Sequence, residues 1–159
     1  MKFGMSLLAS FCILATSAMS ISLSIGRILE TSLYADDLAR AELFYEKVLG
    51  LKLFTKEKGR HVFFKCGGQM LLIFNPAKTL QETEVPHGAC GPGHVAFAVP
   101  LGKLDLWIGR LNEHGIEVEK DMSWPGGGRS IYFRDPAGNC LELASPLVWR
   151  MPDEGLLIA

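Results

Sequence analysis

Near the end of the chain a carboxylate stands inside an apolar strand pattern. The segment CLELASP, residues 140–146, places Glu142 between Leu141 and Leu143. Successive side chains of a strand point to opposite faces of a sheet, so Glu142 is expected to face away from both leucines. Because burying an unpaired carboxylate costs free energy, Glu142 requires a partner or a cavity into which it points. This requirement makes Glu142 the first candidate for chemistry.

The elements that position Glu142 belong to the second of two similar halves of the chain. In each half the hydrophobic pattern predicts a strand, a helix and then three strands. The first helical pattern has apolar residues at 38, 41, 44, 45, 48 and 49 and stops at Gly50, which is typical of a helix end. Predicted strands span residues 27–35, 51–55, 59–66 and 70–76 around a helix at 36–50, and residues 93–100, 116–122, 126–135 and 140–146 around a helix at 104–115.

The two halves also match residue by residue. GRHVFF, residues 59–64, corresponds to GRSIYF, residues 128–133, and Pro76 corresponds to Pro146. Such a repeat predicts an α+β fold of two βαβββ modules, each about fifty residues long. A sheet with a helix on one face leaves a concave cleft on the other face if it curls, and that cleft suits a small ligand. We expect one domain over 25–146, with module one at 27–76, a connector at 77–91, module two at 92–146 and a C-terminal tail at 147–159.

Residues 1–24 are set apart from this domain. The first twenty residues contain Lys2, an apolar run and then small residues, which is the layout of a secretory signal peptide. An N-terminal extension with a later start at Met19 is the alternative. We therefore expect export if the segment is cleaved and a cytoplasmic protein if it is not. Cys66, Cys90 and Cys140 have no C-x-x-C spacing, so neither a disulfide framework nor a structural zinc site is expected.

The composition narrows the classes of partner. The chain has 159 residues, of which 48% are hydrophobic and 21% are charged, with a net charge of −1 when histidine is neutral. These values are typical of a globular domain, and without a basic run we expect no nucleic-acid partner. The apolar run near the N-terminus is too short to cross a bilayer comfortably, so no stable membrane span is expected. The predicted cleft favours a small-molecule substrate.

Three segments together resemble the vicinal oxygen chelate superfamily. They are ETSLYADDLARAELFYEKVLGLKL, GPGHVAFAVP and IYFRDPAGNCLELASP, and the resemblance spans residues 27–146. This superfamily includes glyoxalase I, fosfomycin-modifying enzymes, extradiol dioxygenases, methylmalonyl-CoA epimerase and bleomycin-binding proteins. The resemblance implies paired βαβββ modules, commonly in a homodimer, with a metal centre in the cleft.

Members of this superfamily take metal ligands from the first and last strands of each module. Carried onto this chain, the positions hold Glu30 (where a histidine is usual), His94 and Glu142. The fourth position falls on Leu72, or on Leu71 if the register slips by one residue, where glyoxalase I has a carboxylate. The resemblance thus implies one divalent ion, Mn²⁺, Fe²⁺, Ni²⁺, Zn²⁺ or Mg²⁺, held by the first three residues.

An alternative explanation of these residues needs no metal. Glu30 and Glu142 would then pair with Arg60 or Arg129, and His94 would be a hydrogen-bonded structural histidine. Matches at three family positions favour the metal over this alternative.

Five further residues are candidates for binding the substrate. Arg60 and His61 lie on a predicted strand of module one, and Arg129 is their counterpart in module two. An arginine there would bind an anionic group bidentately or form a surface ion pair. His87 in the connector titrates near neutrality and would carry protons at the mouth of the site. Trp124, beside a proline and three glycines, would cover the cleft as a lid or pack against a dimer partner.

The resemblance implies a glyoxalase-like, metal-dependent lyase or isomerase. The metal would bind a small substrate through adjacent oxygens and stabilise an enediolate or an oxyanion. Glu30 and Glu142 would be the catalytic carboxylates, with Glu30 detaching to act as the base. The leucine at the fourth ligand position argues against the two-base mechanism of glyoxalase I.

Other functions stay open. One is a metal-free binding protein that sequesters an antibiotic or a toxic metabolite, and another is a structural or regulatory dimer with a vestigial cleft. An extradiol-type dioxygenase fits less well, because its ligands are two histidines and one glutamate. Fosfomycin modification agrees with the ligand positions, but the basic residues that hold a phosphonate are not evident in the sequence.

Overall fold

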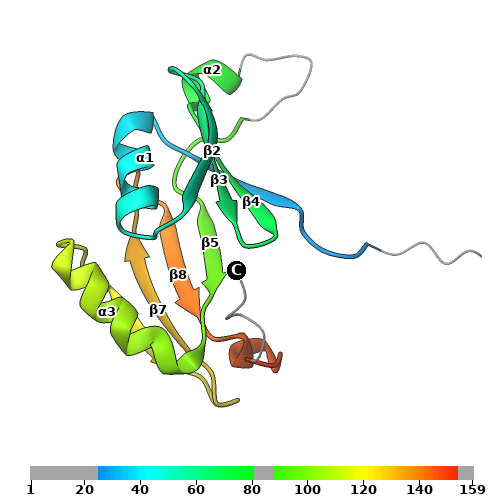
Figure 1. Ribbon diagram of the computed structural model, residues 1–159, viewed down its shortest axis with the longest axis vertical. Helices are drawn as coiled ribbons and strands as arrows, with labels where there is room; N and C mark the ends of the chain where they lie inside the picture. Colours follow the sequence, from blue (N-terminus) through cyan, green and yellow to red (C-terminus); the bar gives the residue numbers. More distant parts are fainter. Residues whose placement is uncertain (1–24, 81–87, 154–159) are drawn as a thin grey trace, which may run out of the picture.

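Two four-stranded sheets make up most of the computed structural model, which describes residues 25–80 and 88–153 (Figure 1). The strand order is β1-β4-β3-β2 in the first sheet and β5-β8-β7-β6 in the second. In each sheet the first strand of the module pairs in parallel with the last, and the other neighbours are antiparallel. The predicted α+β fold of two βαβββ modules is therefore confirmed. The signal-like segment, residues 1–24, lies outside the described residues.

The order of elements is the same in both modules. Module one contains β1 (Glu30–Tyr34), α1 (Leu38–Lys47), β2 (Lys52–Glu57), β3 (His61–Cys66) and β4 (Gln69–Phe74), followed by the short helix α2 (Pro76–Thr79). Module two contains β5 (His94–Ala98), α3 (Leu104–Glu113), β6 (Lys120–Ser123), β7 (Arg129–Arg134) and β8 (Cys140–Ala144). Two 3-10 turns, η1 (Leu101–Lys103) and η2 (Pro146–Trp149), precede α3 and follow β8.

The sequence sets the ends of the two long helices. At the start of α1 the Asp37 carboxylate accepts a hydrogen bond from the backbone N–H of Arg40 at 3.0 Å, which satisfies one of the free donors of the first turn. Past the end of α1, Gly50 has φ +70°, and past the end of α3, Gly115 has φ +68°. This left-handed conformation ends a helix and favours glycine. Each helix is thus limited to the length that covers one sheet.

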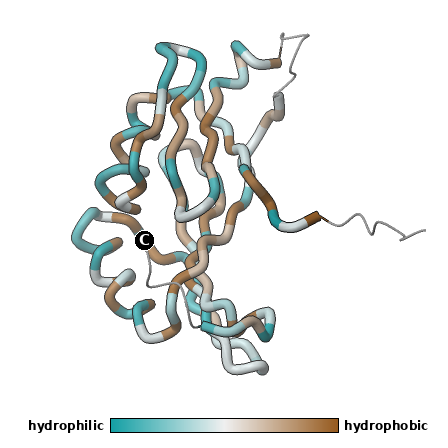
Figure 2. The backbone as a smooth tube through the Cα atoms, turned by 45° about the vertical axis from the view of Figure 1, so that its right-hand side comes forward, coloured by the Kyte–Doolittle hydropathy of each residue, from teal (hydrophilic) through white to brown (hydrophobic). Residues whose placement is uncertain are grey.

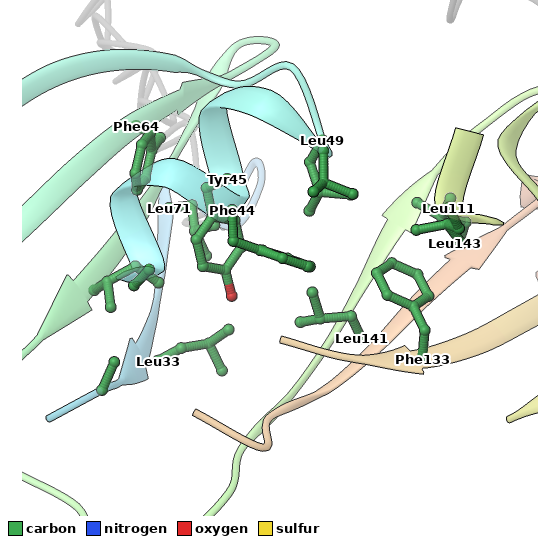
Figure 3. Packing of buried hydrophobic residues seen from close by; sticks show 14 of the residues in the cluster. Leu33, Phe44, Tyr45, Leu49, Phe64, Leu71, Leu111, Phe133, Leu141 and Leu143 are labelled. Carbon is green, nitrogen blue, oxygen red and sulfur yellow. The ribbon is translucent and has the colours of Figure 1, made fainter. Parts of the chain in front are cut away.

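One hydrophobic core joins the two modules on the helix side of the sheets (Figure 3). In module one Tyr45 of α1 packs against the sheet residues Phe64 and Leu71, and in module two Phe133 and Leu141 lie in the same cluster. Each of these side chains is at most 1% exposed. Full burial of a large apolar side chain contributes about 1.5–3 kcal/mol, so this cluster is the main source of stability.

Polar contacts between the modules lie at the edge of this core. The Tyr45 hydroxyl donates to the Asp135 carboxylate at 2.8 Å, and both side chains are buried. The Asn139 amide donates to the same carboxylate at 2.8 Å and to the backbone oxygen of Tyr34 at 3.1 Å. Asn139 Oδ1 in turn accepts from the backbone N–H of Gly93 at 2.7 Å. The turn before β8 is therefore tied to module one and to the start of β5.

The structure differs from the sequence prediction at β6. The alternating pattern predicted a strand over 116–122, but β6 begins only at Lys120. Ile116 and Val118 pack against the common core instead of pairing along β7, which accounts for the late start. Within residues 25–80 and 88–153, no helix is long and apolar enough to cross a membrane.

Candidate functional site

Each sheet has an open face, which is the face turned away from its long helix. The core residues of the strands alternate with these open-face residues, as expected for a strand. Figure 1 shows both long helices on the same side of their sheets. The open face of module two carries His94, Ala96 and Ala98 of β5, Ser130, Tyr132 and Arg134 of β7, and Cys140, Glu142 and Ala144 of β8.

The open face of module two brings together two of the predicted metal ligands. His94 Nε2 lies 3.4 Å from Glu142 Oε2. Glu142 is 8% exposed, whereas the His94 side chain is 52% exposed. The pair therefore joins a buried carboxylate to an imidazole that solvent reaches.

A hydrogen bond to the backbone sets the tautomer of a neutral His94. His94 Nδ1 lies 3.0 Å from the backbone oxygen of Cys140, and a carbonyl oxygen only accepts hydrogen bonds. Nδ1 must then carry a proton, so in the neutral imidazole Nε2 presents its lone pair toward Glu142. Two acceptors that face each other at 3.4 Å require a proton or a cation between them. A histidine that donates one nitrogen to a carbonyl and offers the other is the usual form of a histidine metal ligand, so the pair fits a divalent cation.

Tyr132 and Ser130, which the sequence analysis did not select, lie beside Glu142. Tyr132 is the cross-strand neighbour of Glu142 in the β7–β8 pairing. The pKa of Tyr132 is raised, first by burial and further by the neighbouring Glu142 carboxylate, against an opposing contribution from Ser130. The signal for both residues was present, because Ser130 and Tyr132 alternate with the core residues Ile131 and Phe133.

Trp124 borders the same face of module two. Its indole nitrogen donates to Ser130 Oγ at 2.9 Å, and 40% of the residue is exposed. The loop that carries it is closed by a hydrogen bond from the Trp124 backbone N–H to the Gly128 oxygen at 2.8 Å. Trp124 is thus bonded to Ser130, which lies two residues before Tyr132, the cross-strand neighbour of Glu142. Its role in substrate binding stays a prediction.

Glu30 does not join His94 and Glu142 within one chain. Glu30 is the first residue of β1 and is exposed, and residues 25–29 before it project away from the body of the molecule (Figures 1 and 2). Among the described residues, no group of three or more His, Cys, Asp or Glu side chains is placed to hold a metal. The expectation that all three ligands meet is thus not realised in a single copy, because β1 and β5 are edge strands of different sheets.

The strand registers place the fourth ligand position on Leu72 rather than Leu71. Leu72 pairs with Ser32 of β1 and Phe63 of β3, just as Glu142 pairs with Ala96 of β5 and Tyr132 of β7. By the same registers Glu30 corresponds to His94. Leu72 is 5% exposed and offers no ligand atom.

Arg129 forms the ion pairs that the sequence analysis gave as the alternative to substrate binding. Its guanidinium lies 2.6 Å from the Asp121 carboxylate and 2.7 Å from that of Asp105 on α3. The hydrogen bond from Arg129 lowers the pKa of Asp121, and both partners raise the pKa of Arg129. Arg129 is next to Ser130 and so points to the opposite face of the sheet from Glu142.

The other candidates of module one lie on its own open face. The His61 ring stacks on Phe63 with 4.0 Å between ring centroids, and Arg60 Nη1 lies 2.7 Å from His61 Nδ1. Arg60 also lies over the Phe74 ring at 5.8 Å from its centroid. The structure therefore keeps these residues in a sheet separate from that of Glu142. His87 lies outside the described residues.

The chain is similar in sequence to a known protein family and to several curated proteins. Residues 26–143 match the family model described as the Glyoxalase/Bleomycin resistance protein/Dioxygenase superfamily. A metallothiol transferase FosB of Bacillus licheniformis is 33% identical over 67% of this chain and 67% of its own length. A fosfomycin resistance protein FosX of Listeria innocua is 27% identical over 77% of this chain and 84% of its own.

A solved structure supports the same relationship. The crystal structure of a lactoylglutathione lyase from Agrobacterium tumefaciens superposes with a TM-score of 0.77 and 43% sequence identity. The match covers 80% of this chain and 98% of that one. A glyoxalase/bleomycin resistance protein/dioxygenase from Nocardioides is 27% identical with a TM-score of 0.63, over 87% and 93% of the two chains.

Proposed function

This chain belongs to the glyoxalase/bleomycin resistance protein/dioxygenase superfamily, and from that premise we propose that it is a metal-dependent enzyme of the glyoxalase type. In this proposal it is a lyase or isomerase that binds a small substrate through oxygens on adjacent atoms. The observation that carries the proposal is the approach of His94 Nε2 to the buried Glu142 carboxylate at 3.4 Å, with His94 Nδ1 bonded to a backbone oxygen. The donor set of one nitrogen and carboxylate oxygens accepts Mn²⁺, Fe²⁺, Ni²⁺, Zn²⁺ or Mg²⁺.

The third ligand, Glu30, comes from a second copy of the chain in this proposal. The stretch that leads to Glu30 is apolar and exposed: Ile25 is 96%, Ile28 72% and Leu29 62% exposed. Apolar surface of this kind favours burial against a partner. A two-fold dimer that covers it on both copies would form two equal sites, each with Glu30 of one chain and the His94–Glu142 pair of the other.

The side chains divide the chemistry among them. A divalent cation bound at this site supplies Lewis acidity that stabilises negative charge on the substrate oxygens. Glu30, which is exposed, removes the proton from the substrate carbon beside those oxygens and returns it to the neighbouring carbon. Glu142 and His94 hold the site, and Tyr132 lies beside Glu142 on the neighbouring strand.

Transfer of a thiol to a small electrophile is a second candidate function. Leu72 favours it, because the position that corresponds to Glu142 offers no second base for moving a proton between two carbons. Addition of a thiol to an electrophile activated by a Lewis acid needs no such base pair. The FosB relative named above is a metallothiol transferase, which is consistent with this candidate.

Metal analysis of protein purified without chelators tests the proposal. We expect about one divalent ion per chain. Reconstituted protein should isomerise a hemithioacetal substrate, whereas consumption of an electrophile only together with free thiol would favour the second candidate. A chain that takes up no stoichiometric divalent ion, and that gains neither thermal stability nor activity when ions are added, would contradict the proposal and favour the metal-free binding protein.

A further inference from the structure

A series of hydrogen bonds crosses the open face of module two toward Glu142. The Trp124 indole donates to Ser130 Oγ at 2.9 Å, and Ser130 Oγ donates to Tyr132 Oη at 3.4 Å. Tyr132 is in turn the cross-strand neighbour of Glu142, on the same face of the sheet. We propose that Ser130 and Tyr132 are positioning residues that orient Glu142 for a divalent cation, with Trp124 as the outer end of the series. This inference rests on the proposed metal-dependent function.

The indole nitrogen fixes the start of the series, and the remaining hydroxyls can continue it toward Glu142. An indole nitrogen donates and never accepts, so Trp124 must be the start. Ser130 is fully buried, so its hydroxyl has no access to bulk water and directs its single hydrogen to Tyr132. The single hydrogen of the Tyr132 hydroxyl is then left for Glu142. A carboxylate accepts only, and it is the natural end of such a series.

The series approaches Glu142 from the side opposite to His94. Strand β8, which carries Glu142, lies between β5 with His94 and β7 with Tyr132. Glu142 Oε2 faces His94 Nε2, while Tyr132 lies opposite Glu142 on the other neighbouring strand. In this inference Glu142 is held between the Tyr132 hydroxyl as donor and His94 Nε2 as ligand nitrogen. Hydrogen bonds of this kind to a metal ligand restrict its rotation and are worth about 10–100-fold in metal affinity.

Module one provides an internal comparison for this inference. The position of Tyr132 is occupied by Phe63, and that of Ser130 by His61. A phenylalanine ring cannot donate a hydrogen bond, and the corresponding strand residue is Leu72, which could not accept one. The hydroxyl series thus occurs in the module whose last strand carries a carboxylate.

Binding of Mn²⁺, followed by electron paramagnetic resonance of the free ion, tests the inference. Tyr132→Phe keeps the ring and removes the hydroxyl, so we expect its Kd for Mn²⁺ to rise about 10–100-fold. The matched control is Tyr45→Phe, which removes a phenol bonded to a different carboxylate, Asp135. We expect that control to leave the Kd unchanged within about twofold, since Asp135 is no part of the site.

A double-variant cycle separates positioning from general loss of structure. Ser130→Ala alone should weaken Mn²⁺ binding, but it should add little once Tyr132→Phe has already broken the series. Additive losses, or Tyr132→Phe protein that binds Mn²⁺ as tightly as the wild type, would overturn the inference and leave the proposed function intact. Wild-type protein that binds neither Mn²⁺ nor Zn²⁺ would overturn both.

The fluorescence of Trp124 gives a readout that does not depend on affinity. The chain has three tryptophans, so Trp107→Phe with Trp149→Phe leaves Trp124 as the reporter. Saturating Mn²⁺ should change the emission of Trp124 through the hydrogen-bond series, and Tyr132→Phe should remove that change at saturation. An equal change in the presence and absence of Tyr132 would contradict the series.

Discussion

The open faces of the two modules have the same strand registers but opposite chemistry. Module two has Glu142 and Tyr132 where module one has Leu72 and Phe63. On module two Tyr132 accepts a hydrogen bond from Ser130 and Glu142 faces His94, whereas on module one Phe63 stacks on His61 with 4.0 Å between ring centroids. At this central pair of equivalent positions, the duplicated sheet therefore carries polar side chains in module two and apolar ones in module one.

At one pair of equivalent positions, both modules have a residue whose side chain can bind a metal ion. Glu30 begins β1 and His94 begins β5, and both are exposed. In a single copy only His94 has Glu142 beside it. The asymmetry between the modules therefore agrees with a site that two copies complete.

Replacing Glu142 is expected to have the largest effect. Glu142→Gln keeps the shape of the side chain but removes its charge, so divalent-cation affinity should fall by at least about 100-fold. Isothermal titration with Mn²⁺ or Zn²⁺ measures this loss. The matched change in module one is Leu72→Met, which conserves volume and should leave the affinity unchanged. Equal cation affinities for wild type and Glu142→Gln would show that Glu142 does not bind the metal. The functional difference between Glu142 and Leu72 would then be lost.

Truncation of Leu72 should produce the complementary result. Because Leu72 is 5% exposed, Leu72→Ala should lower the free energy of unfolding by about 2–5 kcal/mol. Urea denaturation at a fixed protein concentration measures this change. Cation affinity of the folded variant should stay near that of the wild type. A loss below about 1 kcal/mol would mean that this face of module one is not a stabilising one.

The contact between the modules predicts a smaller loss with a characteristic pH dependence. Tyr45→Phe removes a buried hydrogen bond to the Asp135 carboxylate and should cost about 1.5–3 kcal/mol near neutral pH. Burial and Asp135 raise the pKa of Tyr45 well above its ordinary 10.0. The neutral phenol is therefore favoured in the folded state, so its contribution is complete below pH 10.0 and is lost as the pH rises further.

Unfolding of wild type and Tyr45→Phe between neutral pH and pH values above 10.0 checks this dependence. The difference in the free energy of unfolding should shrink as the pH rises, because the unfolded wild type ionises first. If the difference in the free energy of unfolding grew with pH, ionisation of Tyr45 would not be the cause of the pH dependence.

The ion pairs of Arg129 should have the smallest effect. Arg129→Gln should lower the free energy of unfolding by only about 0–1 kcal/mol, because Asp121 and Asp105 are solvent-exposed partners. The pKa of Asp121 is lowered by the hydrogen bond from Arg129, so this contribution is present above the ordinary value of 3.8 and is lost as the pH falls. Cation affinity should not change. A large loss of cation affinity in Arg129→Gln would show that Arg129 contributes to the metal site.

Much of the fold was predictable because local patterns encode it. The alternation around Leu141 and Leu143 predicted that Glu142 faces the other way, and the glycines after both helices predicted where these end. The late start of β6 was missed, because Ile116 and Val118 satisfy a strand pattern and a core contact equally well.

The site was predictable only in part. The proximity of His94 to Glu142 follows from their adjacent strands, but the position of Glu30 depends on how the edges of two sheets are placed, which residue spacing does not encode. Tyr132 was missed because an aromatic residue in a strand is usually a core residue. The strand register, which the sequence does not state, is what places Tyr132 opposite Glu142.

Complementation between two inactive chains tests the shared site most directly. Glu30→Ala and His94→Ala chains, each with its own affinity tag, would be co-expressed and purified as the mixed pair. Such a pair has one site with both substitutions and one with none, so it should bind about one divalent ion, while either variant alone should bind none tightly. A mixed pair that binds no ion, although wild type does, would contradict the account, as would Glu30→Ala protein with wild-type affinity.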